Sequence, residues 1–177
     1  MILPIIPDDE ERSYFQAART RPRLYDLTRL MLGTGMRPDE VLTLRAADVQ
    51  RSVPAVTVQH GKSRAARRTI RLLGDCSEIL CRLSDGSRPA EYLFPGRKKG
   101  AHASPMNGAH TAACIETGVH FRLYNLRHTF ATWMAVKGMP LTTLAAILGP
   151  SNLRCVMRYV HPTQAQMDQA MAAYAAA

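Results

Sequence analysis

Two arginines and a tyrosine are the residues of this chain best suited to chemistry on a phosphate. Arg37 and Arg127 carry permanently charged planar forks that can bracket the oxygens of a phosphoryl group, where a lysine acts only as a point charge. Tyr159 lies beside the apolar stripe of a predicted helix, so its ring can pack while its hydroxyl reaches a groove as a nucleophile. A tyrosine in such a position also suits simple packing.

Arg37 directly precedes the start of a predicted helix. Pro38 fits the first helical position, so free backbone N–H groups and the helix dipole favour an anion beside Arg37. Glu40 falls at the third helical position, where its carboxylate can reach back to the helix start or to Arg37. The alternative interpretation is an ordinary capping pair on a surface helix.

Arg127 belongs to a second helical stretch. Tyr124, Arg127 and His128 are spaced i, i+3 and i+4, so they share one face of that helix. Phe130 and Trp133 are expected to pack inside on another face. One face can therefore pack in the core while the other contacts a ligand.

Four segments form a spaced series: Thr34-Gly-Met-Arg37-Pro-Asp-Glu40, Tyr124-Asn-Leu-Arg127-His128, Leu148-Gly149-Pro150 and Arg158-Tyr159-Val160-His161. Arg127 precedes Pro150 by 23 residues, and Pro150 precedes Tyr159 by 9. The series resembles the catalytic domain of the tyrosine recombinase (phage integrase) family, over about residues 10–165.

The resemblance implies a mechanism for cutting and rejoining DNA. Arg37 and Arg127 would bind the scissile phosphate, Glu40 would orient the site, and Tyr159 would attack the phosphodiester to give a 3′-phosphotyrosine and a free 5′ hydroxyl. Lys62, on a hairpin loop, would be the general acid for the departing 5′ oxygen, since a lysine can release its proton and an arginine cannot. The family's chemistry needs no metal and no cofactor.

Two residues depart from the family pattern. Tyr124 stands where the family usually has a histidine that assists proton transfer, and Pro150 stands where it usually has a histidine that donates to the phosphate. Each loss is expected to lower the rate by about one to three orders of magnitude unless Tyr124, His128 or His120 substitutes. The hypothesis is a recombinase with weakened or DNA-activated chemistry.

The net charge of +9 is concentrated in the middle of the chain, because residues 51–100 hold 11 Lys and Arg against 4 Asp and Glu. Such an excess favours salt-sensitive DNA binding, and a solvated basic surface is the alternative. The candidate DNA-binding residues are Arg64, Arg67, Arg68, Arg97, Lys98 and Lys99.

The elements that must position these residues are mostly helical. Helices are expected from Asp8 or Asp9 to about 19, from about 24 to a left-handed stop at Gly33, and over 38–45, 75–83, 107–117, 124–137, 140–148 and 152–160, with a tail helix from about 164. Alternation over 55–58 and 69–72 predicts a β-hairpin, and residues 86–105 are expected to form a loop with a short extended piece around Tyr92-Leu-Phe94. The fold class is therefore mainly α with a small antiparallel β-sheet, that is α+β.

Length and composition suit a single domain. The 177 residues carry no apolar run long enough to span a membrane, and we expect no signal peptide. The four cysteines lack zinc-type spacing, so reduced thiols are expected. We expect one catalytic domain over 1–177, with its core at 10–165 and a tail helix at 164–177, and no N-terminal core-binding domain. The tail resembles the family's helix that docks into a neighbouring protomer, although it can also fold back or fray.

The expected partner is double-stranded DNA, with a homotetramer on DNA and a monomer when free, in the bacterial cytoplasm and on the nucleoid when bound. Three alternatives stay open. The chain can be a degenerate integrase remnant that only binds DNA, a type IB topoisomerase-like enzyme, or a DNA-binding protein whose helices at 124–137 and 140–148 form a helix-turn-helix.

Overall fold

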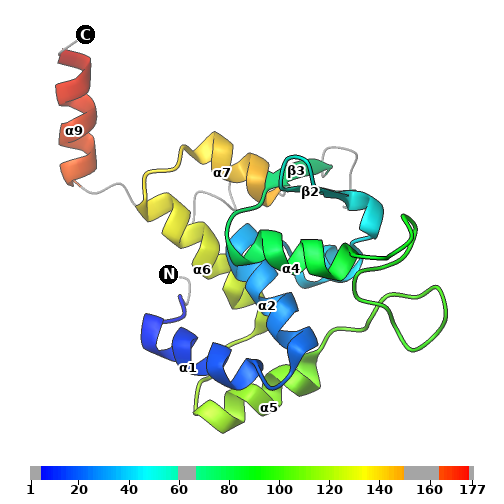
Figure 1. Ribbon diagram of the computed structural model, residues 1–177. Helices are drawn as coiled ribbons and strands as arrows, with labels where there is room; N and C mark the ends of the chain where they lie inside the picture. Colours follow the sequence, from blue (N-terminus) through cyan, green and yellow to red (C-terminus); the bar gives the residue numbers. More distant parts are fainter. Residues whose placement is uncertain (1–4, 60–66, 150–163, 176–177) are drawn as a thin grey trace.

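The computed structural model describes residues 5–59, 67–149 and 164–175 of the chain (Figure 1). Its N-terminal part consists of α1 (Asp8–Ala18), α2 (Pro22–Thr34) and the short α3 (Pro38–Leu42). Four acidic residues fill the first turn of α1, where they complement the helix dipole. All three helices begin close to the predicted positions, although Pro7 rather than Asp8 or Asp9 occupies the cap of α1.

The end of α2 differs from the prediction. Gly33 lies inside the helix, and Gly35 is the left-handed residue that ends it, with φ 67°. A Cβ atom built on Gly33 would lie 2.3 Å from the Cys76 sulfur, so this glycine allows close packing instead of a turn. The predicted stop at Gly33 is therefore wrong by two residues.

A three-stranded antiparallel sheet follows, with the strand order β1 (Val49–Gln50), β2 (Ala55–Val58), β3 (Arg68–Arg71). Val56 pairs with Ile70 and Val58 pairs with Arg68. The predicted hairpin is confirmed in its strands. The two-residue β1 is too short to give an alternating pattern, which is why the sequence did not predict it.

The later helices are α4 (Asp75–Ser84), α5 (Asn107–Thr117), α6 (Leu123–Val136), α7 (Leu141–Leu148) and α9 (Gln164–Ala175). Each matches its predicted range closely. The prediction for 38–45 was too long, because Thr43 leaves the helix and Arg45 forms a β-bridge with Tyr92. The helix predicted over 152–160 lies outside the described residues.

The core forms around α2, which packs against α1, α3, α4 and α6. In Figure 1, α1 and α5 lie together on one side of α2, and the sheet with α4 and α7 lies on the other. Leu27 and Leu30 of α2 are fully buried, and each such side chain contributes about 1.5–3 kcal/mol. A second buried cluster joins α6 to α7 through Phe130, Ala131, Leu144 and Leu148. This arrangement confirms the predicted fold class.

The described helices include none long and apolar enough to cross a membrane. Cys76, Cys81 and Cys114 are free, and Cys155 lies outside the described residues. Burial raises the pKa of the Cys76 thiol to about 11 and also raises the pKa of Cys114. Among the described residues, no group of three or more His, Cys, Asp or Glu is placed to hold a metal ion.

Candidate active site

Arg37 and Glu40 meet at the start of α3. Arg37 precedes Pro38 in an extended conformation, with φ −73° and ψ 155°. One oxygen of the Glu40 carboxylate accepts from the Arg37 backbone N–H at 2.9 Å, and the other accepts from Arg37 Nη1 at 2.8 Å. The carboxylate therefore holds both the helix start and the guanidinium of Arg37.

Arg127 reaches the same carboxylate from α6. Its Nη1 lies 3.9 Å from Glu40 Oε2 and donates to the Gly35 carbonyl at 2.6 Å, while Nη2 donates to the Leu148 carbonyl at 2.8 Å. The side chain of Arg127 is only 6% exposed. The structure thus brings Arg127 to Arg37 and Glu40, which lie much earlier in the sequence.

Arg68 is the third guanidinium on Glu40. It donates from Nη1 at 3.2 Å and from Nη2 at 2.7 Å, one bond to each carboxylate oxygen. We expected Arg68 among the DNA-binding cations of the hairpin, but its side chain is only 7% exposed. The reason is the strand period, since Arg68 shares its face of β3 with the buried Ile70. This alternation was the signal in the sequence that could have separated Arg68 from its neighbour Arg67, which is exposed.

Arg37, Arg68 and Arg127 around Glu40 are called the arginine cluster below. With three arginines against one glutamate, its net charge is +2. Burial alone would raise the pKa of Glu40, but the hydrogen bonds and charges of Arg68 and Arg37 outweigh burial and hold this pKa below its usual value. Burial and the charge of Arg37 lower the pKa of Arg127. The cluster therefore keeps its carboxylate ionised and carries excess positive charge.

Tyr124 stands beside the arginine cluster, on the first turn of α6. Burial alone would lower the pKa of Arg37, but the charge of Glu40 and the hydrogen bonds of Glu40 and of the Tyr124 hydroxyl raise it, so the phenol and Arg37 are direct neighbours. The Tyr124 ring is 40% exposed and packs edge-on against His128, with the ring centroids 5.0 Å apart. Tyr124, Arg127 and His128 do share the predicted helix face.

Other candidate residues are only partly described. Tyr159, Lys62, Arg64 and Pro150 lie outside the described residues. Gly149 is described, and its backbone φ of 82° is one that residues with a side chain rarely adopt. A Cβ built there would lie 2.9 Å from Arg68 Nη1, so the backbone after α7 passes directly against the arginine cluster.

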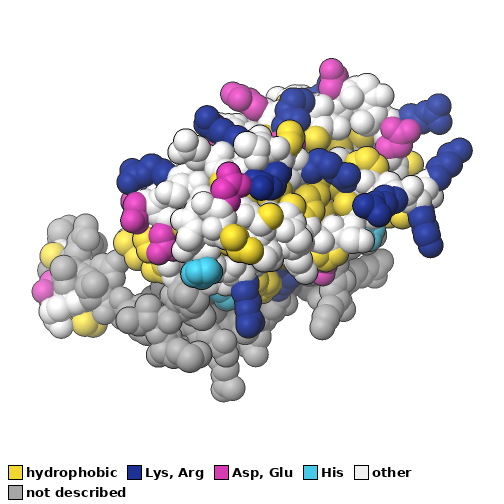
Figure 2. Space-filling model, turned by 90° about the horizontal axis from the view of Figure 1, so that it is seen from below, with side chains coloured by type: hydrophobic (Ala, Val, Ile, Leu, Met, Phe, Trp, Pro, Cys, Tyr) yellow, Lys and Arg dark blue, Asp and Glu magenta, His cyan; other side chains and the backbone are white. Residues whose placement is uncertain are grey.

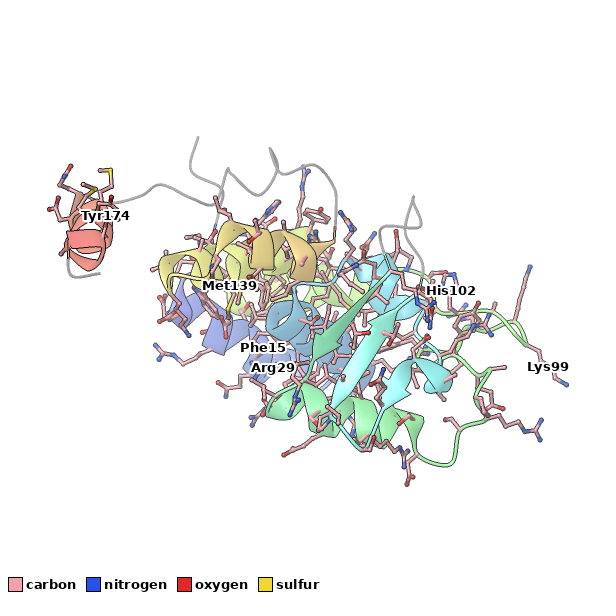
Figure 3. The ribbon with its side chains drawn as sticks, turned by 90° about the horizontal axis from the view of Figure 1, so that it is seen from above. Phe15, Arg29, Lys99, His102, Met139 and Tyr174 are labelled. Atoms are coloured by element: carbon pink, nitrogen blue, oxygen red, sulfur yellow. The ribbon has the colours of Figure 1, made fainter. Side chains whose placement is uncertain are left out.

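Arg97, Lys98 and Lys99 are exposed on the loop that precedes α5. Figure 3 shows Lys99 pointing away from the body at the outer end of this loop. Figure 2 shows Lys and Arg side chains gathered toward one end of the face seen from below, with acidic side chains mixed among the cations elsewhere. Arg97 and Lys98 also line a cavity of about 760 Å³ together with Arg21 and Arg23, which the sequence did not single out. No residue of the arginine cluster lines this cavity.

The chain matches the Phage integrase family over residues 5–166. This match covers most of the chain, which therefore belongs to the phage integrase family.

Two curated relatives are tyrosine recombinases. A tyrosine recombinase of Thermosipho africanus (strain TCF52B) is 28% identical over 162 residues, covering 88% of this chain and 56% of the relative. The tyrosine recombinase XerC of Erythrobacter litoralis (strain HTCC2594) is 32% identical over 176 residues, covering 89% and 54%. The chain spans slightly more than half the length of these relatives.

Solved structures share the fold. The integrase of the Tn1549 transposon, in complex with circular intermediate DNA, superposes with a TM-score of 0.80 at 19% identity and covers 97% of this chain and 67% of that one. The XerA recombinase superposes with a TM-score of 0.73 at 21% identity, covering 98% and 66%. The catalytic domain of bacteriophage HP1 integrase gives 0.70 at 22% identity, covering 96% and 94%.

Proposed function

We propose that this chain is the catalytic domain of a site-specific DNA recombinase, which cuts and rejoins DNA strands through a 3′-phosphotyrosine. The observation that carries the proposal is the arginine cluster, in which Arg37 and Arg127 reach one buried carboxylate from separate elements. Membership of the phage integrase family supports the same reaction.

A phosphodiester is the ligand that best fits the arginine cluster. Buried charge of one sign is costly unless an anion balances it, and the cluster carries a net charge of +2. The transition state of phosphoryl transfer spreads negative charge over its nonbridging oxygens, which planar guanidinium forks bind well. Arg127 uses two N–H groups on the Gly35 and Leu148 carbonyls, and further donors remain on the same guanidinium.

Each residue of the site has its own role in the proposed reaction. Arg37 and Arg127 bind the nonbridging oxygens, and Glu40 holds the guanidinia in place. Tyr159 forms the new bond from its phenol oxygen to phosphorus as the bond from phosphorus to the 5′ oxygen breaks, and Lys62 gives that oxygen its proton. The phenol of Tyr159 loses its proton in this step, and Tyr124 and His128 are the groups available to assist that transfer where the family usually has a histidine.

Double-stranded DNA is the proposed partner, bound through Arg64, Arg67, Arg97, Lys98 and Lys99. The Tn1549 integrase, which shares the fold, was solved with DNA, and this supports the assignment. A homotetramer on DNA and a monomer when free are proposed for this chain as well, with a mobile element as its source and the bacterial cytoplasm as its location.

Covalent trapping tests the proposal. With nicked suicide substrates drawn from a random-sequence library, the short fragment that bears the free 5′ hydroxyl diffuses away after cleavage, so an active enzyme accumulates a covalent adduct. We expect an adduct with the natural chain and none with Tyr159→Phe. If no sequence traps an adduct and Tyr159→Phe binds DNA with the same affinity as the natural chain, the protein is a DNA-binding remnant. Relaxation of supercoiled plasmid without strand exchange would instead identify a topoisomerase.

A further inference from the structure

Arg68 and Glu40 form a two-bond ion pair that is almost fully buried. The two hydrogen bonds measure 3.2 and 2.7 Å, and the side chains are 7% and 6% exposed. Such paired bonds fix orientation as well as distance, because the plane of the guanidinium must align with the plane of the carboxylate. Glu40 is therefore held by Arg68 in one orientation toward Arg37 and Arg127.

Arg68 also holds the end of α7. Its Nε donates to the Ile147 carbonyl at 2.5 Å, and Arg127 Nη2 donates to the next carbonyl, that of Leu148, at 2.8 Å. The last carbonyls of a helix lack partners within the helix, and positive groups complement the negative end of its dipole. Two neighbouring guanidinia therefore cap α7 side by side.

The backbone beyond α7 leaves little room around Arg68. Gly149 approaches so closely that an added Cβ would lie 2.9 Å from Arg68 Nη1 and 3.2 Å from its Cζ. The guanidinium is thus enclosed by Glu40 on α3, the end of α7 and Gly149. A side chain packed in this way transmits any displacement to its neighbours.

We propose that Arg68 is a positioning residue, which fixes the Glu40 carboxylate and the end of α7 and thereby aligns Arg37 and Arg127 on the scissile phosphate. The inference rests on the proposed function and adds a residue to its site. Arg68 itself makes no contact with the substrate in this scheme. Lysine is no substitute, since one ammonium lacks the planar fork needed for both carboxylate oxygens and a carbonyl.

The test compares Arg68→Lys and Arg68→Ala with Arg71→Lys and Arg71→Ala. Arg71 is an exposed arginine on the same strand, on its opposite face, and is a matched control. Single-turnover formation of the covalent adduct is measured on a trapped suicide substrate, and affinity for the same duplex is measured over a series of salt concentrations. Arg67→Ala serves as the comparison for loss of an exposed cation near the DNA.

We expect adduct formation to slow about 10- to 100-fold in both Arg68 variants, the usual effect of a small misplacement of catalytic groups. In both Arg68 variants, the slope of the logarithm of DNA affinity against the logarithm of salt concentration stays unchanged. Arg67→Ala reduces that slope by about one unit. The Arg71 variants keep the natural rate. If the Arg68 variants lose affinity and slope as Arg67→Ala does, at an unchanged saturated rate, Arg68 contacts DNA and the inference is overturned. A natural rate in Arg68→Lys overturns it as well.

A second measurement separates this inference from the proposed function. The side-chain carboxyl ¹³C shift of Glu40 is followed as the pH falls, in the natural chain and in Arg68→Lys. We expect Glu40 to titrate at higher pH in Arg68→Lys and at the natural pH in Arg71→Lys. If the natural chain traps no adduct, the proposed function fails, while an altered titration still assigns the positioning of Glu40 to Arg68. An unaltered titration overturns that assignment even if the chain is active.

Discussion

Arg127 donates from Nη1 to the carbonyl oxygen of Gly35 at 2.6 Å, across 92 residues of sequence. Gly35 also ends α2 in the left-handed conformation, with φ 67°. A Cβ on this glycine would lie 2.5 Å from the Phe130 ring and 2.8 Å from Leu148. One glycine therefore turns the chain toward Arg37, accepts a bond from Arg127 and allows α6 and α7 to pack closely.

Replacing Gly35 is expected to destabilise the fold. Gly35→Ala combines the left-handed backbone penalty with a clash against Phe130, so we expect a loss of about 2–4 kcal/mol in the free energy of unfolding, measured by urea titration. Gly108 is the control, because it lies within α5 with open space around it. Gly108→Ala should stabilise the protein by about 0.5–1 kcal/mol. Equal effects of the two substitutions would contradict this account of Gly35.

Lysine in place of either arginine proposed to bind the phosphate should nearly abolish cleavage. Arg37→Lys and Arg127→Lys each keep the charge but lose the planar fork, so we expect adduct formation to fall about 100- to 1000-fold. Arg127→Lys should also lower the free energy of unfolding by about 1–3 kcal/mol, since one ammonium cannot serve both buried carbonyls. Arg12→Lys, at an exposed position of α1, is the control. Near-natural cleavage by Arg37→Lys would show that the guanidinium of Arg37 is not needed to bind the phosphate.

The sequence predicts the helices of this fold well because their apolar repeats and glycine stops are local signals. Asn107–Thr117 was predicted with its observed bounds, and Gly118, at φ 72°, ends it. Residues 33–35 misled the prediction because two glycines compete for one stop, and only the packing of Cys76 against Gly33 decides between them. Local sequence signals fail where contacts with distant parts of the chain determine which residue ends a helix.

The candidate site was predictable in its residues but not in all its contacts. The spacing of Arg37, Glu40 and Arg127 identified three side chains that the fold does bring together. The pairing of Arg68 with Glu40 joins residues 28 positions apart, and no local pattern specifies such a partner. The clustering of basic residues suggested a solvent-facing Arg68, whereas strand alternation determined the side on which it lies.

Tyr124 provides a direct test of the altered site. Tyr124→His restores the residue that the family usually has, and we expect it to raise the rate of adduct formation about tenfold or more at neutral pH, because imidazole transfers protons near that pH. Tyr124→Phe removes the hydroxyl beside Arg37 and should lower the rate. Both rates are measured in single turnover on the same suicide substrate. A slower Tyr124→His variant would mean that the site has adapted to the phenol.

His110 should make the fold sensitive to mild acid. The Tyr14 hydroxyl lies 2.8 Å from Nδ1 of this buried histidine, and Nε2 lies 2.8 Å from the Phe121 carbonyl oxygen, so the neutral ring accepts at Nδ1 and donates from Nε2. Burial lowers the pKa of His110 below its ordinary value of 6.5, although the bond to Phe121 partly opposes this. The unfolded chain therefore binds the proton more readily than the folded one, and the stability that His110 contributes above pH 6.5 is lost as the pH falls toward its folded pKa.

The measurement is the melting temperature from pH 8 to pH 5, for the natural chain, His110→Gln and the exposed control His120→Gln. We expect the melting temperature of the natural chain and of His120→Gln to fall as the pH drops through this range. His110→Gln should be less stable at pH 8, where it loses the paired ring, and its melting temperature should depend less on pH. The same pH dependence in all three proteins would place the acid sensitivity at a group other than His110.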